Sequence, residues 1–294
     1  MTKKSNLLLI PFNRPHYLKQ VLKNFDRSNF KEVFCFIDGP RNELDATGIA
    51  GVKKILQKHG ITNINAQSKN LGINPAFETA ISWFFDNVED GVILEEDCVP
   101  DSSFFTFAQE MLDKYHHQKQ IGMITGSNPH PNGENSYFFS HQFGIWGWAT
   151  WRDRWQKYTK IKKSGNIKVS FVDLLKFTGS FAGALTLQTK FNRLTCPSMG
   201  FWDMNWTYTN VINDWLCVIP NKNLITNIGH FGNSSFKKTQ FHDLATEKII
   251  IEKMKHPTKI EANLSYDRYL DWHYNFLPAL KSFIYQKINY KKFN

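Results

Sequence analysis

Three consecutive carboxylates, Glu95, Glu96 and Asp97, stand directly after the apolar segment 91–94. Adjacent acidic groups at the end of a buried strand repel one another, so the arrangement is costly unless a cation or hydrogen bonds neutralise it. A hard divalent cation, Mg²⁺ or Mn²⁺, takes carboxylate oxygens as ligands and can also hold a diphosphate. The alternative is a solvated acidic turn without a metal. The triplet by itself leaves both interpretations open.

Common motifs of nucleotide-binding proteins, serine hydrolases and zinc proteases are missing from the sequence. Neither G-x-x-x-x-G-K-[ST] nor G-x-G-x-x-G occurs, and G-x-S-x-G and H-E-x-x-H are absent as well. A nucleotide bound by this chain would therefore be held by side chains at strand ends and by a metal, rather than by a glycine-rich loop. This arrangement suits a nucleotide-sugar, because its diphosphate leaving group needs charge neutralisation.

The elements that must position these residues are readable from hydrophobic periodicity. Over residues 1–128, short apolar runs alternate with segments of helical spacing, which predicts an α/β fold with a mostly parallel sheet flanked by helices. Ligands of such sheets bind outside the carboxyl ends of the strands, where Asp38 and the acidic triplet fall. The predicted strands are 7–10, 33–37, 61–66, 91–94 and 121–125. The predicted helices begin near Pro15 and Pro75, span 49–56, and follow a cap at Asp101 or Ser102.

Residues 129–245 are less regular and rich in Trp, Asn and Gly. We expect this part to be an irregular, acceptor-binding portion of the same unit. Trp148, Trp151 and Trp155 are spaced as on a helix, which favours packing in the core. We expect one Trp of segment 146–155 to lie near the acceptor and the others to be buried. Asp203 precedes a segment that can be helical, so a helix N-cap is one interpretation of that residue.

Several segments together resemble GT-A glycosyltransferases, and most closely the N-acetylglucosaminyltransferase I family. In segment 92–105 the acidic triplet follows an apolar strand and precedes Pro-Asp and Phe-Phe, as in that family, with Glu96 standing where the family has Asp. Phe201-Trp202-Asp203 is similar to the family's Phe-Trp-Asp, and Trp206 follows closely. Shorter matches extend the resemblance over roughly residues 6 to 245, at Asn13-Arg14, Asp38, Asn70-Leu71-Gly72, 144–148 and His230-Phe231-Gly232.

The resemblance implies a GT-A fold, a UDP-sugar donor and a Mn²⁺ or Mg²⁺ cofactor. It also implies a mobile loop over the donor, containing Gly232, with Lys237 and Lys238 within reach of a phosphate. His230 is a second candidate metal ligand, although a lone His is more often structural. The roles implied for the other residues are diphosphate contact for Arg14, uracil recognition for Asp38, sugar contact for Glu95, ribose contact for Glu96, metal ligation for Asp97, lining of the sugar pocket for Trp202, and general base for Asp203.

The chemistry of glycosyl transfer agrees with these roles. An acceptor hydroxyl is a poor nucleophile, so a carboxylate must take its proton as the new bond forms. A base opposite the leaving group gives one displacement and an inverted configuration. Asp214 and Asp153 are the rivals of Asp203 for this task. N-acetylglucosamine is the donor sugar of the family, and another hexose remains open.

The formal net charge is +10, from 36 Lys and Arg against 26 Asp and Glu. Basic residues concentrate in segment 152–168 and in the tail, where no acidic residue follows Asp271 and lysines mix with aromatic residues. The interpretations are a solvated face, an anionic membrane surface, an anionic acceptor or nucleic acid. We expect no nucleic-acid partner, because the acidic triplet would repel phosphate without a metal. Peripheral membrane contact through the tail is one expectation.

We expect one glycosyltransferase domain over residues 1–245, with a donor half at about 1–128 and an acceptor half at about 129–245. A helical, basic-aromatic extension is expected over 246–294. The apolar run 7–10 is too short for a signal segment, and the four cysteines are widely spaced, as buried thiols would be. We therefore expect a cytoplasmic enzyme. If its acceptor is a lipid-linked glycan of surface polysaccharide or lipopolysaccharide assembly, we expect it at the inner face of the plasma membrane.

Three alternatives stay open. A non-catalytic nucleic-acid-binding protein fits the charge and the aromatic content of 15 %. A sugar-nucleotide pyrophosphorylase shares the parallel-sheet logic, although Pro11 to Pro15 stands where such an enzyme usually has a glycine-rich segment. A lectin-like relative without catalysis would lack metal dependence.

Overall fold

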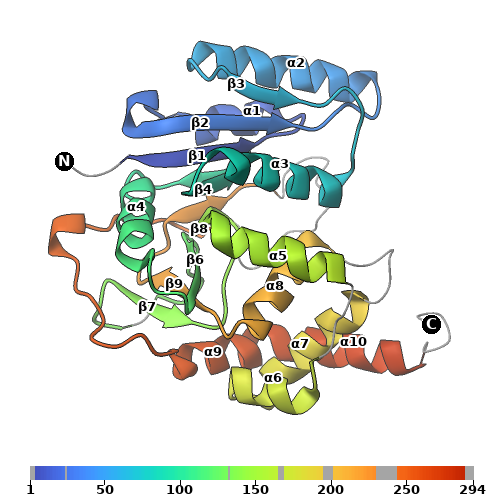
Figure 1. The fold of residues 1–294 in the computed structure, drawn as a ribbon, viewed down its shortest axis with the longest axis vertical. Coiled ribbons are helices and arrows are strands. Elements are labelled where there is room, and N and C mark those ends of the chain that lie inside the picture. The colour runs from blue at the N-terminus through green and yellow to red at the C-terminus, as the bar shows by residue number, and fades with distance from the viewer. Residues whose placement is uncertain are drawn as a thin grey trace.

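The computed structural model describes residues 4–23, 25–131, 133–164, 169–194, 201–229 and 244–288, and their centre is an eight-stranded sheet (Figure 1). The strand order is β3-β2-β1-β4-β8-β6-β9-β7. Strands β7 and β8 run antiparallel to their neighbours, and the remaining pairs are parallel. The mostly parallel sheet is as predicted. Its strands are β1 (Ser5–Ile10), β2 (Phe30–Ile37), β3 (Asn63–Ala66), β4 (Asp90–Glu95), β6 (Ile121–Thr125), β7 (Tyr137–Ser140), β8 (Trp148–Trp151) and β9 (Leu216–Pro220).

Helices cover both faces of the sheet, because successive side chains of a strand point to opposite faces. Leu7 and Leu9 of β1 pack in one apolar core, and Leu8 and Ile10 pack in another. The first core contains residues of α1 (Pro15–Val21), α2 (Glu43–Lys58) and α4 (Phe104–Tyr115). The second contains residues of α3 (Ile73–Asn87), α5 (Arg152–Ser164) and α8 (Trp202–Ile212).

All five strands predicted within residues 1–128 are present, and so are the four helices. The predicted N-cap residue of α4, Asp101 or Ser102, is wrong by one or two positions. Ser103 is the N-cap residue, and the Oδ1 atom of Asp101 instead accepts hydrogen bonds from the backbone N–H and the hydroxyl of Ser103, at 2.8 and 2.6 Å. Asp101 thus stabilises the turn that leads into the helix.

The tryptophan-rich segment is a strand followed by a helix, and its helical interpretation is wrong. Trp148 and Trp151 begin and end β8, which is inserted between β4 and β6. Three residues along a strand reverse the side chain, so Trp148 packs in one core and Trp151 in the other. Trp155 lies on α5. All three are buried, as core packing predicted.

Helices fill much of the second half, which the sequence indicated to be irregular. A capping box of Ser170 and Asp173 opens α6 (Phe171–Thr178), and Gly179 ends it with φ of 61°. With α7 (Phe181–Leu194) and α8 it forms a third, smaller apolar cluster. The C-terminal helical segment consists of α9 (Leu264–Leu270), the π-helical turn η3 (Asp271–Asn275) and α10 (Phe276–Ile288), which packs against α7.

The remaining short elements are two 3₁₀ turns and a second, two-stranded sheet. The turns are η1 (Arg27–Asn29) and η2 (Ile251–Lys253). The small sheet pairs β5 (Cys98–Pro100) with β10 (Ile225–Asn227). The chain is anchored to the main body on both sides of η2, since Ile249 before it is buried in the first core and Tyr266 of α9 is buried in the second.

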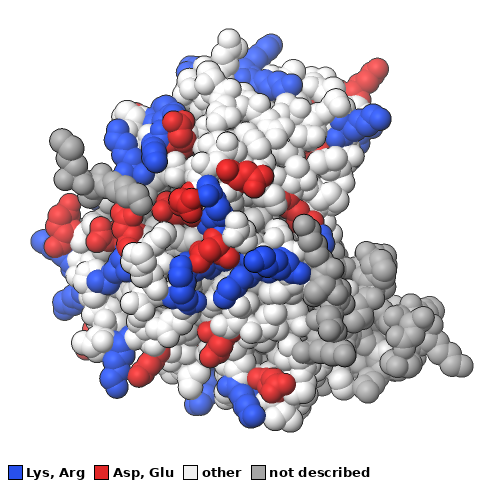
Figure 2. Space-filling model, in the orientation of Figure 1, with Lys and Arg blue, Asp and Glu red and all other residues white. Residues whose placement is uncertain are grey.

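The structure bears on two features considered from the sequence, membrane-spanning segments and cysteines. Within the described residues, no helix combines the length and the apolarity that a bilayer span requires. Cys35, Cys98 and Cys217 are buried free thiols, as expected, and Cys196 lies outside the described residues. On the face drawn in Figure 2, basic and acidic side chains are interspersed rather than separated.

We predict that Trp206→Ala lowers the free energy of unfolding by about 3–5 kcal/mol, the usual cost of emptying a buried aromatic site. Trp206 is buried, and its ring centroid lies 5.4 Å from that of Trp148, 5.8 Å from Trp155 and 5.9 Å from Trp215. Urea unfolding measures the change. Leu44→Ala, at an exposed site on α2, is the control and should change it by less than about 0.5 kcal/mol. Equal effects of the two substitutions would contradict this packing.

Candidate functional site

The strand order of the sheet reverses between β1 and β4. β2 and β3 lie on one side of β1, and β4 lies on the other. Ligands of open α/β sheets bind outside the carboxyl ends of the strands at such a switch point. Ile10 at the end of β1 is paired with Glu95 at the end of β4, so the segments that follow both strands emerge side by side. The first carries Arg14 and the second carries the acidic triplet.

Arg14 forms ion pairs with two carboxylates of the triplet. Its Nε donates to Oε1 of Glu96 at 2.8 Å, and its Nη2 donates to Oδ2 of Asp97 at 2.7 Å. Burial lowers the pKa of Arg14, but Glu96 and Asp97 outweigh it and raise the pKa above its ordinary value. The guanidinium also lies 5.0 Å from the ring centroid of Tyr17. Arg14 therefore stays charged and holds the two acidic side chains together.

The cluster carries more negative charge than Arg14 neutralises. Burial raises the pKa of Glu95 well above its ordinary value, and Asp97, Glu96 and Asp203 raise it further, while Arg14 opposes them. Burial raises the pKa of Glu96 as well, with Arg14 again lowering it. Such an environment favours either a protonated carboxyl or an additional cation.

The described residues include no cluster of three or more His, Cys, Asp or Glu side chains suited to hold a metal ion. The donor set nevertheless fits a hard divalent cation, because Mg²⁺ is commonly bound through one or two carboxylates together with substrate phosphates and water. Oδ2 of Asp97 accepts from Arg14 in this structure, and metal ligation by Asp97 stays a prediction. His230, Gly232, Lys237 and Lys238, the other predicted metal and loop residues, lie outside the described residues.

Gly229 brings the backbone against the carboxylate of Asp97. β10 pairs with β5, and the N–H of Ile228 then donates to the backbone oxygen of Asp97 at 2.9 Å. A Cβ atom on Gly229 would lie 2.2 Å from Oδ2 of Asp97, so no other residue fits there without displacement. Sequence reasoning missed Gly229, and its only signal was a glycine directly after the apolar run that forms β10.

Asp38 lies at the end of β2 and binds the loop that leads into α3. Its Oδ1 accepts from the N–H groups of Gly39 and Leu71, at 2.8 and 2.9 Å. Its Oδ2 accepts from Nδ2 of Asn70 at 2.9 Å and from the N–H of Gly72 at 3.2 Å. A carboxylate has about four acceptor sites. These four donors occupy them, so the role of Asp38 in this structure is to position the loop, and its contact with uracil stays a prediction.

The same loop begins α3, which in turn anchors the start of α8. Oδ1 of Asn74 accepts from the N–H of Trp202 at 3.0 Å. Trp202 is buried, and its ring is stacked on Phe77 with centroids 5.1 Å apart and planes 9° from parallel. Trp202 thus fixes the first turn of α8 within the aromatic core. Its contact with a donor sugar remains a prediction.

Asp203 belongs to the first turn of α8, where Phe201 is the N-cap residue, so the N-cap interpretation of Asp203 is wrong. Burial raises its pKa, whereas Lys190 and backbone N–H groups lower it. Asp203 also contributes to the raised pKa of Glu95, so it lies within electrostatic range of the acidic triplet. Of its rivals, Asp153 is paired with Lys119 and Arg154, and Asp214 is 86 % exposed.

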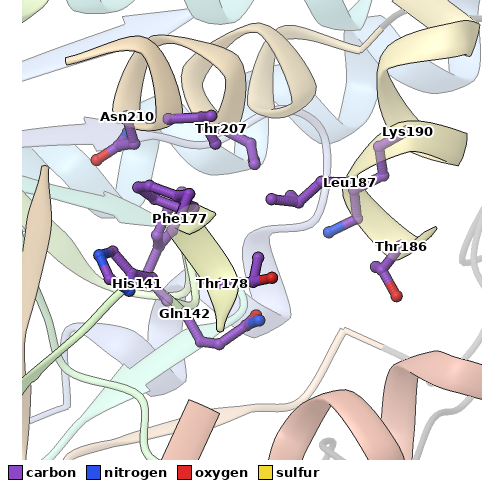
Figure 3. A pocket seen from close by; sticks show the side chains of 11 residues that line it. His141, Gln142, Phe177, Thr178, Thr186, Leu187, Lys190, Thr207 and Asn210 are labelled. Carbon is purple, nitrogen blue, oxygen red and sulfur yellow. The ribbon is translucent and has the colours of Figure 1, made fainter. Parts of the chain in front are cut away.

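A small cavity lies beside the later turns of α8, where Thr207, Asn210 and Val211 line it (Figure 3). Its volume is about 40 Å³, room for a few water molecules at about 10–15 Å³ each and too little for a sugar ring. Burial lowers the pKa of Lys190, which lines the cavity, while Asp203 and Asp271 favour its charged form. Thr207, one helical turn beyond Asp203, also lines it and donates to the backbone oxygen of Asp203 at 2.9 Å. The remaining polar lining residues are His141, Gln142, Thr178, Thr186 and Asn210.

Comparison with known proteins adds little to this geometry. No protein-family model matches the chain, and no curated protein matches it. Among solved structures, a cytidylyltransferase from Leptospira borgpetersenii serovar Hardjo-bovis (strain JB197) is similar with a TM-score of 0.33 and 14 % sequence identity. The match covers 55 % of this chain and 65 % of that one, less than two thirds of its length. A likeness this distant carries no functional argument.

The described residues define a fold and the contacts of one candidate site. The protein has a mixed α/β, Rossmann-like fold with an eight-stranded sheet in its described part. At the switch point of that sheet, one arginine bridges two of three adjacent carboxylates.

We predict that Asp38→Asn lowers the free energy of unfolding by about 1–3 kcal/mol, because the amide offers an N–H₂ group to donors that need an acceptor. Urea unfolding measures this loss. Asp214→Asn is the matched control, since Asp214 is exposed and its φ of 51° suits Asn. If both variants were equally stable, the hydrogen bonds of Asp38 would not matter for folding, and its carboxylate would be available to a ligand.

Proposed function

We propose that this protein is an inverting, divalent-metal-dependent GT-A glycosyltransferase that moves a sugar from a UDP-sugar to a glycan hydroxyl. The observation that carries the proposal is the contact of Arg14 with two carboxylates of the acidic triplet at the switch point of the sheet. Arg14 follows β1, the acidic triplet follows β4, and Asp203 opens α8 within electrostatic range of Glu95. Their order along the chain is also that of the family resemblance.

The donor side of the site is assigned to the arginine and the triplet. Asp97, beside Gly229, would hold Mn²⁺ or Mg²⁺, and Glu96 would lie next to the ribose. Arg14 would orient the diphosphate, for which a planar guanidinium is well suited. The cation, when bound, supplies charge neutralisation for the departing diphosphate. Glu95, whose uncharged form is favoured by burial, would hydrogen-bond a hydroxyl of the donor sugar.

Asp203 is assigned as the general base. The acceptor oxygen forms a bond to the anomeric carbon, the bond from that carbon to the diphosphate breaks, and its electron pair leaves with UDP. The acceptor proton passes to a carboxylate oxygen of Asp203. Because base and leaving group lie on opposite sides of the anomeric carbon, the configuration inverts. A raised pKa makes Asp203 a stronger base at neutral pH than an exposed aspartate.

The acceptor we propose is a glycan or a lipid-linked glycan of surface polysaccharide or lipopolysaccharide assembly. Phe201, two residues before Asp203, is 39 % exposed and would offer an aromatic surface to an acceptor sugar. N-acetylglucosamine is the first donor sugar to test, followed by other hexoses.

We predict that two conservative substitutions separate donor binding from transfer. Asp97→Asn should weaken UDP binding in Mn²⁺ about tenfold or more, because one ligand charge is lost. Asp203→Asn should leave UDP affinity within about twofold but lower the transfer rate about 10²–10⁴-fold, the usual contribution of a general base. Calorimetric titration of UDP measures binding, and release of UDP from UDP-sugars in the presence of glycan acceptors measures transfer.

The controls for this experiment use EDTA and Asp214→Asn. UDP binding should be lost in EDTA, and Asp214→Asn should behave as the unsubstituted protein. Equal loss of donor affinity in Asp97→Asn and Asp203→Asn would contradict the division of roles. Binding of UDP that is unchanged by EDTA would remove the metal from the proposal and leave Arg14 as the neutralising cation. Release of diphosphate from UTP and a sugar phosphate would favour a pyrophosphorylase.

We predict an acid limb in the pH profile of kcat that lies above the ordinary Asp pKa of about 3.9. The base must be deprotonated to act, so activity falls as pH drops through the pKa of Asp203, which burial raises. Because Lys190 lowers that pKa, Lys190→Met should move the limb to higher pH. Lys54→Met on the exposed side of α2 is the control. A limb that stays in place in Lys190→Met would mean that another group titrates.

A further inference from the structure

The exposed side of the C-terminal helical segment carries a mixture of apolar and basic side chains. Trp272 is 50 % exposed, Leu277 is 63 % exposed and Ile284 is 48 % exposed, and Leu264 is exposed at the start of α9. The basic residues Arg268 and Lys281 are exposed as well. We call these six residues the exposed stripe: Leu264, Arg268, Trp272, Leu277, Lys281 and Ile284.

The spacing of the exposed stripe follows the helix geometry. Its successive intervals are four, four, five, four and three residues. Intervals of three and four place side chains on one side of an α-helix. The interval of five, from Trp272 to Leu277, spans the π-helical turn Asp271–Asn275, whose backbone bonds join residues five apart. The π-turn therefore keeps the two α-helical parts of the exposed stripe in line.

The acidic residues of this segment point inward. Asp267 and Asp271 are 1 % and 0 % exposed. Asp267 accepts a hydrogen bond from the hydroxyl of Ser140 at 2.5 Å, and Asp271 accepts from Nε2 of Gln142 at 2.7 Å. Within residues 264–286, whose side chains are described, the outer side thus carries positive charge and no carboxylate. The sequence continues this bias with Lys287, Lys291 and Lys292 and no further acidic residue.

The opposite side of α10 is fixed to the body of the protein. Ala279 is buried, Nε2 of Gln286 donates to the backbone oxygen of Thr189 at 3.1 Å, and Nη2 of Arg193 donates to the hydroxyl of Ser282 at 2.9 Å. Figure 1 shows α10 lying along α7 at the outer edge of the molecule. The exposed stripe is therefore presented on a helix that is held in place, with its outer side in solvent.

We propose that the exposed stripe is a docking surface for an anionic lipid bilayer. Apolar side chains on one side of a helix enter the boundary between headgroups and acyl chains, and neighbouring Arg and Lys side chains are attracted to anionic headgroups. Trp272 has the ring type that prefers this boundary. The inference goes beyond the proposed transferase activity and does not depend on it.

Two other occupants fit the exposed stripe less well. A second copy of the chain in a two-fold contact would bring Arg268 and Lys281 against the same basic residues of the other copy. Nucleic acid would be attracted by the charge but would leave Leu277 and Ile284 without an apolar partner. A lipid surface satisfies the charged and the apolar residues together.

Sedimentation with vesicles tests the proposal without any assay of activity. The full chain should bind vesicles of phosphatidylcholine and phosphatidylglycerol, bind phosphatidylcholine alone more weakly, and lose anionic binding as salt is raised. The double variant Leu277→Glu, Ile284→Glu should bind about tenfold or more weakly, because both apolar contacts become repulsive. Leu44→Glu, an exposed leucine on α2, is the matched control and should bind as the unsubstituted protein.

A second measurement covers the case in which the double variant does not fold. Brominated anionic lipids should quench the tryptophan fluorescence of the unsubstituted chain, and Trp272→Phe should remove a large part of that quenching. Absence of binding to anionic vesicles would overturn the proposal, and so would unchanged quenching in Trp272→Phe. Concentration-dependent dimerisation that Leu277→Glu abolishes would assign the exposed stripe to a second copy instead. Tighter binding to an oligonucleotide than to anionic vesicles would assign it to nucleic acid.

Discussion

Repulsion among three adjacent carboxylates at the end of β4 is the constraint to which the surrounding structure responds. Glu95, Glu96 and Asp97 are placed there by a strand that continues straight out of the core. Arg14, the N-cap residue of α1, follows the neighbouring strand β1 and bridges two of them, because β1 and β4 are paired at their ends. Gly229 lets the backbone approach the carboxylate of Asp97, one of the two that Arg14 bridges, without a side chain between them. Arg14 therefore neutralises only part of the negative charge of the triplet, and such an environment favours a protonated carboxyl or an additional cation.

A second set of contacts positions Asp203 relative to this charge. Asp38 fixes the loop before α3 through four hydrogen bonds. Asn74 in the first turn of α3 then holds the backbone of Trp202, and stacking on Phe77 keeps that ring in the aromatic core. The start of α8 is therefore tied to the same edge of the sheet as the triplet, although the two segments are far apart in sequence. Burial of the carboxylate at this position raises the pKa of Asp203.

Buried carboxylates also fix the C-terminal helices to the rest of the protein. Asp267 and Asp271 point into the protein, where Ser140 and Gln142 bind them. Burial, together with Asp267, raises the pKa of Asp271 to about 7. Gly183 of α7 leaves room for this carboxylate, since a Cβ atom there would lie 2.4 Å from its Oδ2. Because these acids face inward, the outer side of the same helices carries only apolar and basic residues among those of the exposed stripe. The positive charge of the outer side is thus a consequence of burying the two carboxylates on the inner side.

Local spacing was enough to predict the α/β class and to place the acidic triplet at the end of a strand. Alternation of apolar runs with helical periods depends only on neighbouring residues, and the short apolar run before the triplet was predicted correctly as the strand β4. Tertiary structure decided the rest, because it depends on pairings between distant segments. Three-residue spacing of tryptophans is compatible with a helix and with a strand, and only the insertion of β8 between β4 and β6 made it a strand. Long-range packing, which no local pattern encodes, likewise determines the partners of Arg14 and the four donors to Asp38. It also determines the electrostatic interaction of Asp203 with Glu95 and the π-turn that aligns the exposed stripe.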